Sequence, residues 1–163
     1  MLMNNKALSF IGNLLIILVI IAAAPLAILR LFGLQGFCVI SGSMEPTITV
    51  GSIVCVKTVE FDELQDADII AFYSGDSVVT HRVVSIDKDN MLITTKGDAN
   101  NTNDFTPVAY TNVLGKVVFN VPVYGYVATW ISTLSGKLIA AGILIIGVVL
   151  SGLKSSKKLG TNS

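Results

Sequence analysis

A short segment with the sequence SGSMEP, at residues 41–46, presents a serine hydroxyl in a setting suited to chemistry. Ser43 lies between a glycine and a bulky methionine, and Pro46 closes the turn. A serine becomes an effective nucleophile when an adjacent base accepts its proton. The pattern is short enough to occur by chance. Ser43 is therefore a candidate nucleophile only if the chain also supplies a base, an orienting carboxylate and an oxyanion site.

The chain contains one histidine, His81, which lies in a β-branched segment. A neutral imidazole is the usual side chain that takes a serine proton near neutral pH. If the reaction uses a serine and a histidine, His81 is the base. The alternative is a half-exposed strand histidine beside Arg82 that takes no part in catalysis.

An Asn-rich stretch, KGDANNTND at residues 96–104, supplies two carboxylates, Asp98 and Asp104. Either one qualifies as the group that holds the imidazole in one tautomer and stabilises the imidazolium. The same stretch resembles half of a calcium loop, but an EF-hand has Gly where Asn103 stands and Glu where Ala109 stands. A third interpretation is a structural turn, since Asp and Asn tolerate tight backbone geometry.

The composition is that of a membrane protein. A chain of 163 residues allows one modest domain, and a hydrophobic fraction of 52% with a mean hydropathy of +0.73 exceeds that of ordinary soluble domains. The 11 basic residues balance the 11 acidic residues, so the charge does not favour nucleic acid as a partner. With 2 cysteines and 1 histidine the chain lacks the usual ligands of a structural zinc site, and we expect no metal and no cofactor.

The first apolar segment lies between Lys6 and Arg30, an interval without any charged residue. Its core at residues 14–25, with its flanks, provides the ~20 residues that a bilayer span needs. The alanines at residues 22–24 also match the cleavage site of a removable secretory signal. Because the apolar stretch continues to Leu34 and Pro25 would directly follow the scissile bond, we expect a retained transmembrane helix.

A second apolar segment, residues 138–153, is shorter than a full span. We expect it to thin the bilayer, to let Lys137 snorkel or to extend into residues 127–134, where Trp130 suits an interfacial belt. The basic tail that follows predicts a cytoplasmic C-terminus by the positive-inside rule. Two spans then place both termini in the cytoplasm and the middle of the chain outside, although Arg30 fits this orientation poorly.

The middle of the chain consists of β-branched runs separated by polar turns, which predicts strands. We expect a mainly β fold, a small antiparallel meander or partly closed barrel, flanked by N-terminal and C-terminal transmembrane helices. The expected strands are residues 52–59, 68–73, 78–86, 91–95 and 113–118. The expected domains are residues 1–35 (N-terminal cytoplasmic end and anchor), 36–125 (extracytoplasmic β catalytic domain), 126–153 (interfacial segment and second span) and 154–163 (basic cytoplasmic tail).

Three motifs together resemble the ordered boxes of type I signal peptidases: SGSMEP at residues 41–46, THRVV at residues 80–84, and KGDAN at residues 96–100 with Asp104. They are most similar to the branch found in the endoplasmic reticulum, archaea and some Gram-positive bacteria, which uses histidine where the usual bacterial branch has lysine. The resemblance covers residues 37–118 and is specific because the three boxes occur in order. It implies a β domain similar to that of signal peptidases and LexA.

The same resemblance implies roles for individual residues. Ser43 corresponds to the nucleophile and His81 to the general base. Asp104 corresponds to the carboxylate usually assigned as catalytic, with Asp98 essential or structural, and the sequence leaves the choice between them open. The Ser41 hydroxyl and the Ser43 amide correspond to oxyanion donors, although Ser41 serves equally well as a small turn residue.

Two functions follow as expectations. The first is a membrane-bound serine endopeptidase, a signal peptidase I, that cleaves N-terminal signal peptides from exported preproteins after small residues. Its partners are the signal peptides and the lipid bilayer of the cell or the endoplasmic reticulum, and the need for accessory membrane subunits stays open. The second is a non-catalytic membrane-tethered β module that binds envelope partners. Cys38 and Cys55 are expected to be buried thiols, although export permits a disulfide.

Overall fold

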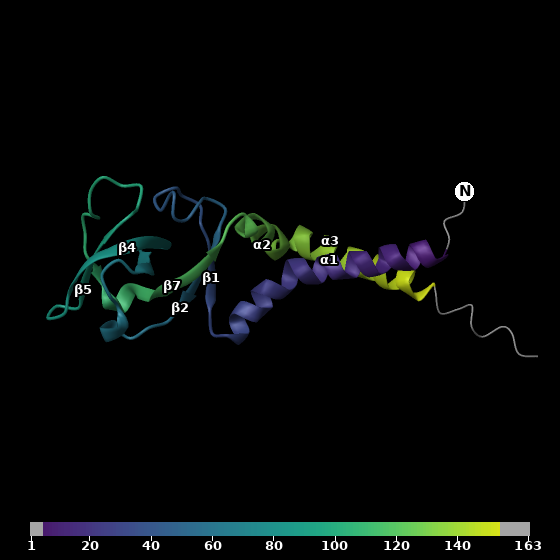
Figure 1. Ribbon diagram of the computed structural model, residues 1–163, viewed down its shortest axis with the longest axis horizontal. Coiled ribbons are helices and arrows are strands. Elements are labelled where there is room, and N and C mark those ends of the chain that lie inside the picture. Colours follow the sequence, from purple (N-terminus) through teal and green to yellow (C-terminus); the bar gives the residue numbers. More distant parts are fainter. Residues whose placement is uncertain (1–4, 154–163) are drawn as a thin grey trace, which may run out of the picture. The chain divides into compact units, whose positions relative to one another are not determined.

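The computed structural model describes residues 5–153, which fall into two compact units. One unit, residues 26–127, holds the strands; the other is helical and joins residues 5–25 with residues 128–153. Figure 1 shows these elements. In chain order they are α1 (Asn5–Leu31), β1 (Gln35–Cys38), β2 (Ile53–Lys57), η1 (Phe61–Glu63), β3 (Ile69–Ser74), β4 (Ser77–Asp87), β5 (Leu92–Lys96), β6 (Val108–Ala109), η2 (Tyr110–Asn112), β7 (Val113–Val121), α2 (Tyr124–Ser132) and α3 (Leu134–Gly152).

The strands of the described residues form a single 7-stranded sheet in the order β1-β2-β7-β3-β4-β5-β6. Every neighbouring pair is antiparallel. The expected fold class, a small antiparallel β domain flanked by apolar helices, is therefore confirmed. The arrangement is more than a meander: β3 to β6 follow one another, but β7 returns to lie between β2 and β3.

The five expected strands correspond to β2, β3, β4, β5 and β7, with differences only at their ends. The turn between β3 and β4 consists of Gly75 and Asp76, and Gly75 has a φ of 59°, which a two-residue hairpin favours. Strands β1 and β6 were not predicted because they have only 4 and 2 residues. Strands this short do not contain enough residues for an alternation of apolar and polar side chains to be recognised.

The sheet buries a separate apolar cluster on each of its faces. On β3, Ile70 and Phe72 belong to one cluster and Ala71 to the other, as expected for residues that alternate along a strand. The second cluster also contains Met44 and Ile48, whose exposed fractions are only 2% and 1%. Burial of such a side chain contributes about 1.5–3 kcal/mol. These two residues therefore hold the segment that carries Ser43 against the sheet.

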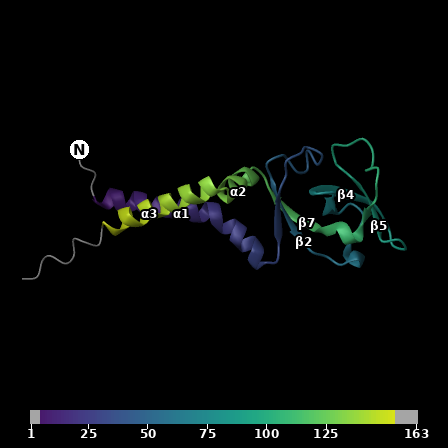
Figure 2. The same ribbon diagram turned by 180° about the vertical axis from the view of Figure 1, so that it is seen from behind.

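The helical unit brings the N-terminal part of α1 alongside α3, as Figures 1 and 2 both show. The contact is close because it is made by glycines: a Cβ placed on Gly12 would lie 2.6 Å from the Gly147 carbonyl oxygen. The Ser9 hydroxyl also donates to the Ser151 carbonyl oxygen at 3.4 Å. Small residues permit such backbone approach between apolar helices.

Two helices of the described residues are long and apolar enough to cross a membrane by length and composition: α1 with 27 residues and α3 with 19 residues. Helix α3 begins at Leu134, where Thr133 caps it by accepting from the Gly136 N–H at 3.0 Å, so it is longer than the apolar run first recognised. Trp130 lies on the separate helix α2. The basic tail at residues 154–163 lies outside the described residues.

Candidate functional site

The segment that carries Ser43 is a tight turn between β1 and β2. The Glu45 N–H donates to the Gly42 carbonyl oxygen at 3.0 Å, and the Ile48 N–H donates to the Met44 carbonyl oxygen at 2.9 Å. The Glu45–Pro46 peptide bond is cis. Because Met44 and Ile48 are buried in the core, the backbone of Ser43 has a fixed position.

His81 lies on β4 and is buried, with 8% of its surface exposed. Its Nδ1 atom is 2.5 Å from Oδ2 of Asp104, and its ring contacts Phe72 edge to face at a centroid distance of 6.2 Å. A carboxylate on Nδ1 favours the tautomer that carries its proton there, which leaves Nε2 free to accept a proton. Of the two candidate carboxylates, Asp104 is the one that the structure brings to His81.

Gly97 is the point at which Ser43 and His81 approach the same loop. A Cβ placed on Gly97 would lie 2.6 Å from the Ser43 carbonyl oxygen and 3.0 Å from Nε2 of His81. The next segment of the loop also binds the turn, since the Ala99 N–H donates to the Ser43 carbonyl oxygen at 2.9 Å. Within residues 5–153 no hydrogen bond joins the Ser43 hydroxyl to His81, but both residues adjoin the same glycine.

Asp104 is held by a residue that the sequence analysis missed. The Thr95 hydroxyl donates to Oδ2 of Asp104 at 2.6 Å, and the Asp104 N–H donates to the Thr95 carbonyl oxygen at 2.8 Å. Thr95 lies on β5 and is fully buried. Its one signal in the sequence is a polar residue in an apolar strand just before the loop, which is too common a pattern to indicate a site.

Asp98 has a different partner from Asp104. The Arg82 guanidinium binds it with two bonds, Nε to Oδ1 at 2.8 Å and Nη2 to Oδ2 at 2.6 Å, and also donates to the Ala67 carbonyl oxygen at 2.8 Å. The two Arg82 bonds to Asp98, together with a side-chain hydrogen bond from Thr47, lower the pKa of the Asp98 carboxyl below its ordinary value. Because a positively charged guanidinium occupies both carboxylate oxygens of Asp98, this residue is not arranged to bind a calcium ion. The pair ties β4 to the loop and to the turn that carries Ser43.

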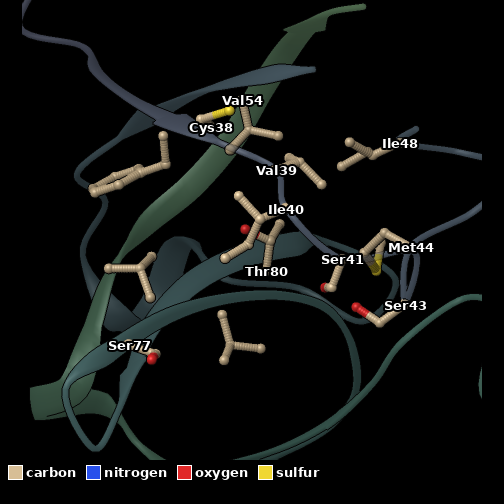
Figure 3. A pocket seen from close by; sticks show the side chains of 13 residues that line it. Cys38, Val39, Ile40, Ser41, Ser43, Met44, Ile48, Val54, Ser77 and Thr80 are labelled. Carbon is tan, nitrogen blue, oxygen red and sulfur yellow. The ribbon is translucent and has the colours of Figure 1, made fainter. Parts of the chain in front are cut away.

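A cavity of about 320 Å³ adjoins Ser43. In Figure 3 the hydroxyl oxygens of Ser41 and Ser43 point into this space, and the rest of its wall is mainly apolar. Cys38 lines the cavity and is half-buried, whereas Cys55 is fully buried, and both are free thiols. The residues that line the cavity are Phe37, Cys38, Val39, Ile40, Ser41, Ser43, Met44, Ile48, Val54, Ser77, Val78, Val79 and Thr80.

The cavity lies beside strand edges that have no neighbour in the sheet. Strand β1 ends the sheet on one side, and β5 pairs with β4 only from Arg82 onward. Residues 77–81 of β4 therefore pair with β3 alone. Such edges can accept an extended peptide by main-chain hydrogen bonds.

Comparison of this sequence with known proteins points to a single family. The family model described as Signal peptidase, peptidase S26 matches residues 11–105. Signal peptidase I W of Bacillus subtilis (strain 168) is 44% identical over 86 residues, which is 50% of this chain and only 45% of that relative. The signal peptidase complex catalytic subunit of Zygosaccharomyces rouxii is 33% identical over 127 residues, which is 69% of this chain and 75% of that relative.

Proposed function

This chain belongs to the signal peptidase S26 family, and from that premise we propose that it is a membrane-bound serine endopeptidase that cleaves N-terminal signal peptides from exported preproteins after small residues. The observation that carries the proposal is that Ser43 and His81 both adjoin Gly97 while Asp104 binds Nδ1 of His81. These residues come from three separate segments of the chain, and a base held by a carboxylate beside a serine is the arrangement that nucleophilic catalysis needs.

In the proposed reaction the Ser43 hydroxyl attacks the scissile carbonyl carbon while Nε2 of His81 takes the hydroxyl proton. Asp104 stabilises the resulting imidazolium through Nδ1. His81 then gives the proton to the leaving amine, which releases the mature protein and leaves the signal peptide as an ester on Ser43. Water, deprotonated by His81, hydrolyses this ester and restores the serine. Asp98 has a structural role through Arg82 in this scheme.

The oxyanion that forms in both steps requires donors close to Ser43. We assign this role to the Ser41 hydroxyl and the Ser43 backbone N–H, which is supported by the two serine hydroxyls pointing into one cavity. Removal of one such donor typically lowers turnover about 10²–10³-fold. The preference for small side chains before the scissile bond is part of the proposal and rests on the family match.

The proposed location is a membrane, with α1 and α3 as the two spans. Both termini are cytoplasmic in this proposal and residues 36–125 form the extracytoplasmic catalytic domain, with residues 126–153 forming an interfacial segment and the second span. The yeast relative is named as a subunit of a complex, so accessory subunits for this chain are part of the proposal to be tested. Cleavage by the purified chain alone in liposomes would show that they are dispensable.

The deciding experiment is cleavage of a signal-bearing preprotein by the wild type, Ser43→Ala and His81→Ala in liposomes. We expect each substitution to lower the rate about 10⁴–10⁶-fold, as for triad knockouts in serine proteases. Ser74→Ala is the matched control because this serine is exposed at the end of β3 and lies outside the cavity. Undiminished cleavage by Ser43→Ala would overturn the proposal and favour the non-catalytic β module.

A further inference from the structure

Thr95 is a buried polar residue whose hydroxyl the proposed reaction does not yet use. Its exposed fraction is 0%, and it pairs with Val83 across the β4–β5 ladder. Side chains at alternate positions of a strand lie on the same face, so Thr95 shares a face with Val83 and hence with His81, two residues earlier on β4. The register of two strands thus places this hydroxyl beside the candidate base.

The hydroxyl and the imidazole meet on one atom. Oδ2 of Asp104 accepts from the Thr95 hydroxyl at 2.6 Å and also lies 2.5 Å from Nδ1 of His81. Two donors on one carboxylate oxygen fix the rotation of the carboxylate about its side chain. Hydrogen bonds to an ionised group are also roughly twice as strong as bonds between neutral groups. The orientation of the His81 ring therefore depends on a carboxylate that Thr95 holds in place.

The hydroxyl bond can be separated from the bond that holds the loop. The Asp104 N–H donates to the Thr95 backbone carbonyl oxygen at 2.8 Å, and this bond does not involve the threonine side chain. Replacement of the hydroxyl by a methyl group therefore keeps the loop attached to β5. It removes only the Thr95 hydroxyl as a donor to Oδ2, and Nδ1 of His81 remains there. Valine has nearly the volume and the β-branched shape of threonine.

We propose that Thr95 is a positioning residue that orients the Asp104 carboxylate, and through it His81, for the reaction at Ser43. This inference rests on the proposed function and adds a fourth member to the Ser43, His81 and Asp104 set. Thr95 does not touch the substrate. Its contribution should appear in the chemical step and leave substrate binding unchanged.

The test compares Thr95→Val and Thr95→Ser with the wild type, using the full chain in liposomes and the same preprotein. We expect Thr95→Val to lower kcat about 10- to 100-fold, as loss of a hydrogen bond to a charged group implies, with KM changed less than about twofold. Thr95→Ser restores the hydroxyl and should keep kcat within about threefold of the wild type. The matched control is Thr94→Val, since the neighbouring threonine faces the other side of β5 and should leave kcat unchanged.

A spectroscopic measurement separates positioning from general loosening of the fold. His81 is the only histidine, so selective labelling of histidine with ¹⁵N gives the resonance of its Nδ1 proton without overlap. We expect Thr95→Val to shift this resonance or to lose it through exchange with water, and Thr95→Ser to retain it. Thermal unfolding midpoints of all three proteins show whether the variants are folded under the assay conditions.

The outcomes distinguish the two proposals. A Ser43→Ala variant that cleaves as fast as the wild type overturns the proposed function, and with it the catalytic role of Thr95. A cleaving wild type with an unchanged kcat or an unchanged His81 resonance in Thr95→Val overturns the Thr95 inference alone. Equal losses in Thr95→Val and Thr95→Ser also overturn it, because they would reflect packing in place of the hydroxyl.

Discussion

At the scale of single residues, the two aspartates of one loop have different environments. Asp104 binds His81, and Asp98 binds Arg82 through both of its oxygens. We expect Asp104→Asn to lower kcat about 10⁴-fold, because an amide in this position favours the wrong imidazole tautomer. Asp98→Asn should lower kcat far less and act mainly on the unfolding midpoint. Rates and thermal unfolding measured on both variants test this, and the reverse ranking of rates would exchange the two roles.

The pKa shift of Asp98 gives a prediction for stability against pH. Hydrogen bonds from Arg82 lower the pKa of this carboxyl below its ordinary value of 3.8, so the folded state binds the proton less readily than the unfolded chain. The stability that the pair contributes is present above the ordinary pKa and is lost as the pH falls through the lowered one. The stability advantage of the wild type over Asp98→Asn should therefore shrink below about pH 4. Thermal unfolding of both proteins across this range tests it; a constant difference would contradict the assignment.

Gly97 allows its loop to lie close to Ser43 and His81. In Gly97→Ala the new methyl group would lie 2.6 Å from the Ser43 carbonyl oxygen, a backbone atom that cannot turn aside. We expect the loop or the Ser43 turn to shift, with kcat reduced about 100-fold or more, since small misplacements of reacting groups have effects of this size. Gly142→Ala is the control for a general loss of activity, because a Cβ at this position on α3 would meet nothing within 4 Å, and a fully active Gly97→Ala would show that the loop adapts.

The sequence could identify a site residue where only one residue of the required type was available. A single histidine leaves one candidate for a histidine base, and an SGSMEP turn leaves one central serine. It was not informative about Thr95 or about the partner of Arg82, because these depend on the register between β4 and β5. Register depends on the turn and on the buried face of both strands, and here it also shifts between Val83 and Ser85, which the residues of β5 alone do not reveal.

At the scale of elements, the longer strands were predictable and their order was not. Alternating β-branched residues indicated β4, which has 11 residues, whereas β1 and β6 are too short to show a period. The position of β7 between β2 and β3 brings together residues far apart in the chain. Non-local pairing of this kind depends on the shared core and leaves no mark in the sequence of β7 itself.

The contact between α1 and α3 gives a prediction at the same scale. In Gly12→Leu the side chain would meet the backbone of Gly147 and Ser151, so the helices must separate. We expect a loss of about 1–3 kcal/mol in the stability of the helical unit, as for other overpacked interfaces. Gly142→Leu is the matched control, since a Cβ placed there meets nothing within 4 Å. Thermal unfolding in detergent tests the difference, and equal midpoints would argue against this packing.

At the scale of the whole molecule, the chain combines a β unit that carries the candidate site with a helical unit that has the length and composition to cross a membrane. The hydropathy of the sequence alone indicated this division, because long apolar segments without charged residues are unfavourable in contact with water. The limits of the expected domains and the orientation of the termini stay predictions. The family match at residues 11–105 includes part of α1 as well as the candidate site, so the apolar helix and the candidate site fall within one family match.

The two thiols of the β unit differ in their access to reagents. Cys38 is half-buried and belongs to the strand that borders the cavity, with its Sγ atom beside Gly125, whereas burial raises the pKa of the Cys55 thiol and disfavours its reactive thiolate. A maleimide fluorophore should therefore react faster at Cys38 and label one position without any engineered cysteine. Its emission would report changes at the border of the cavity when a peptide binds, and in Ser43→Ala it would record docking with no turnover.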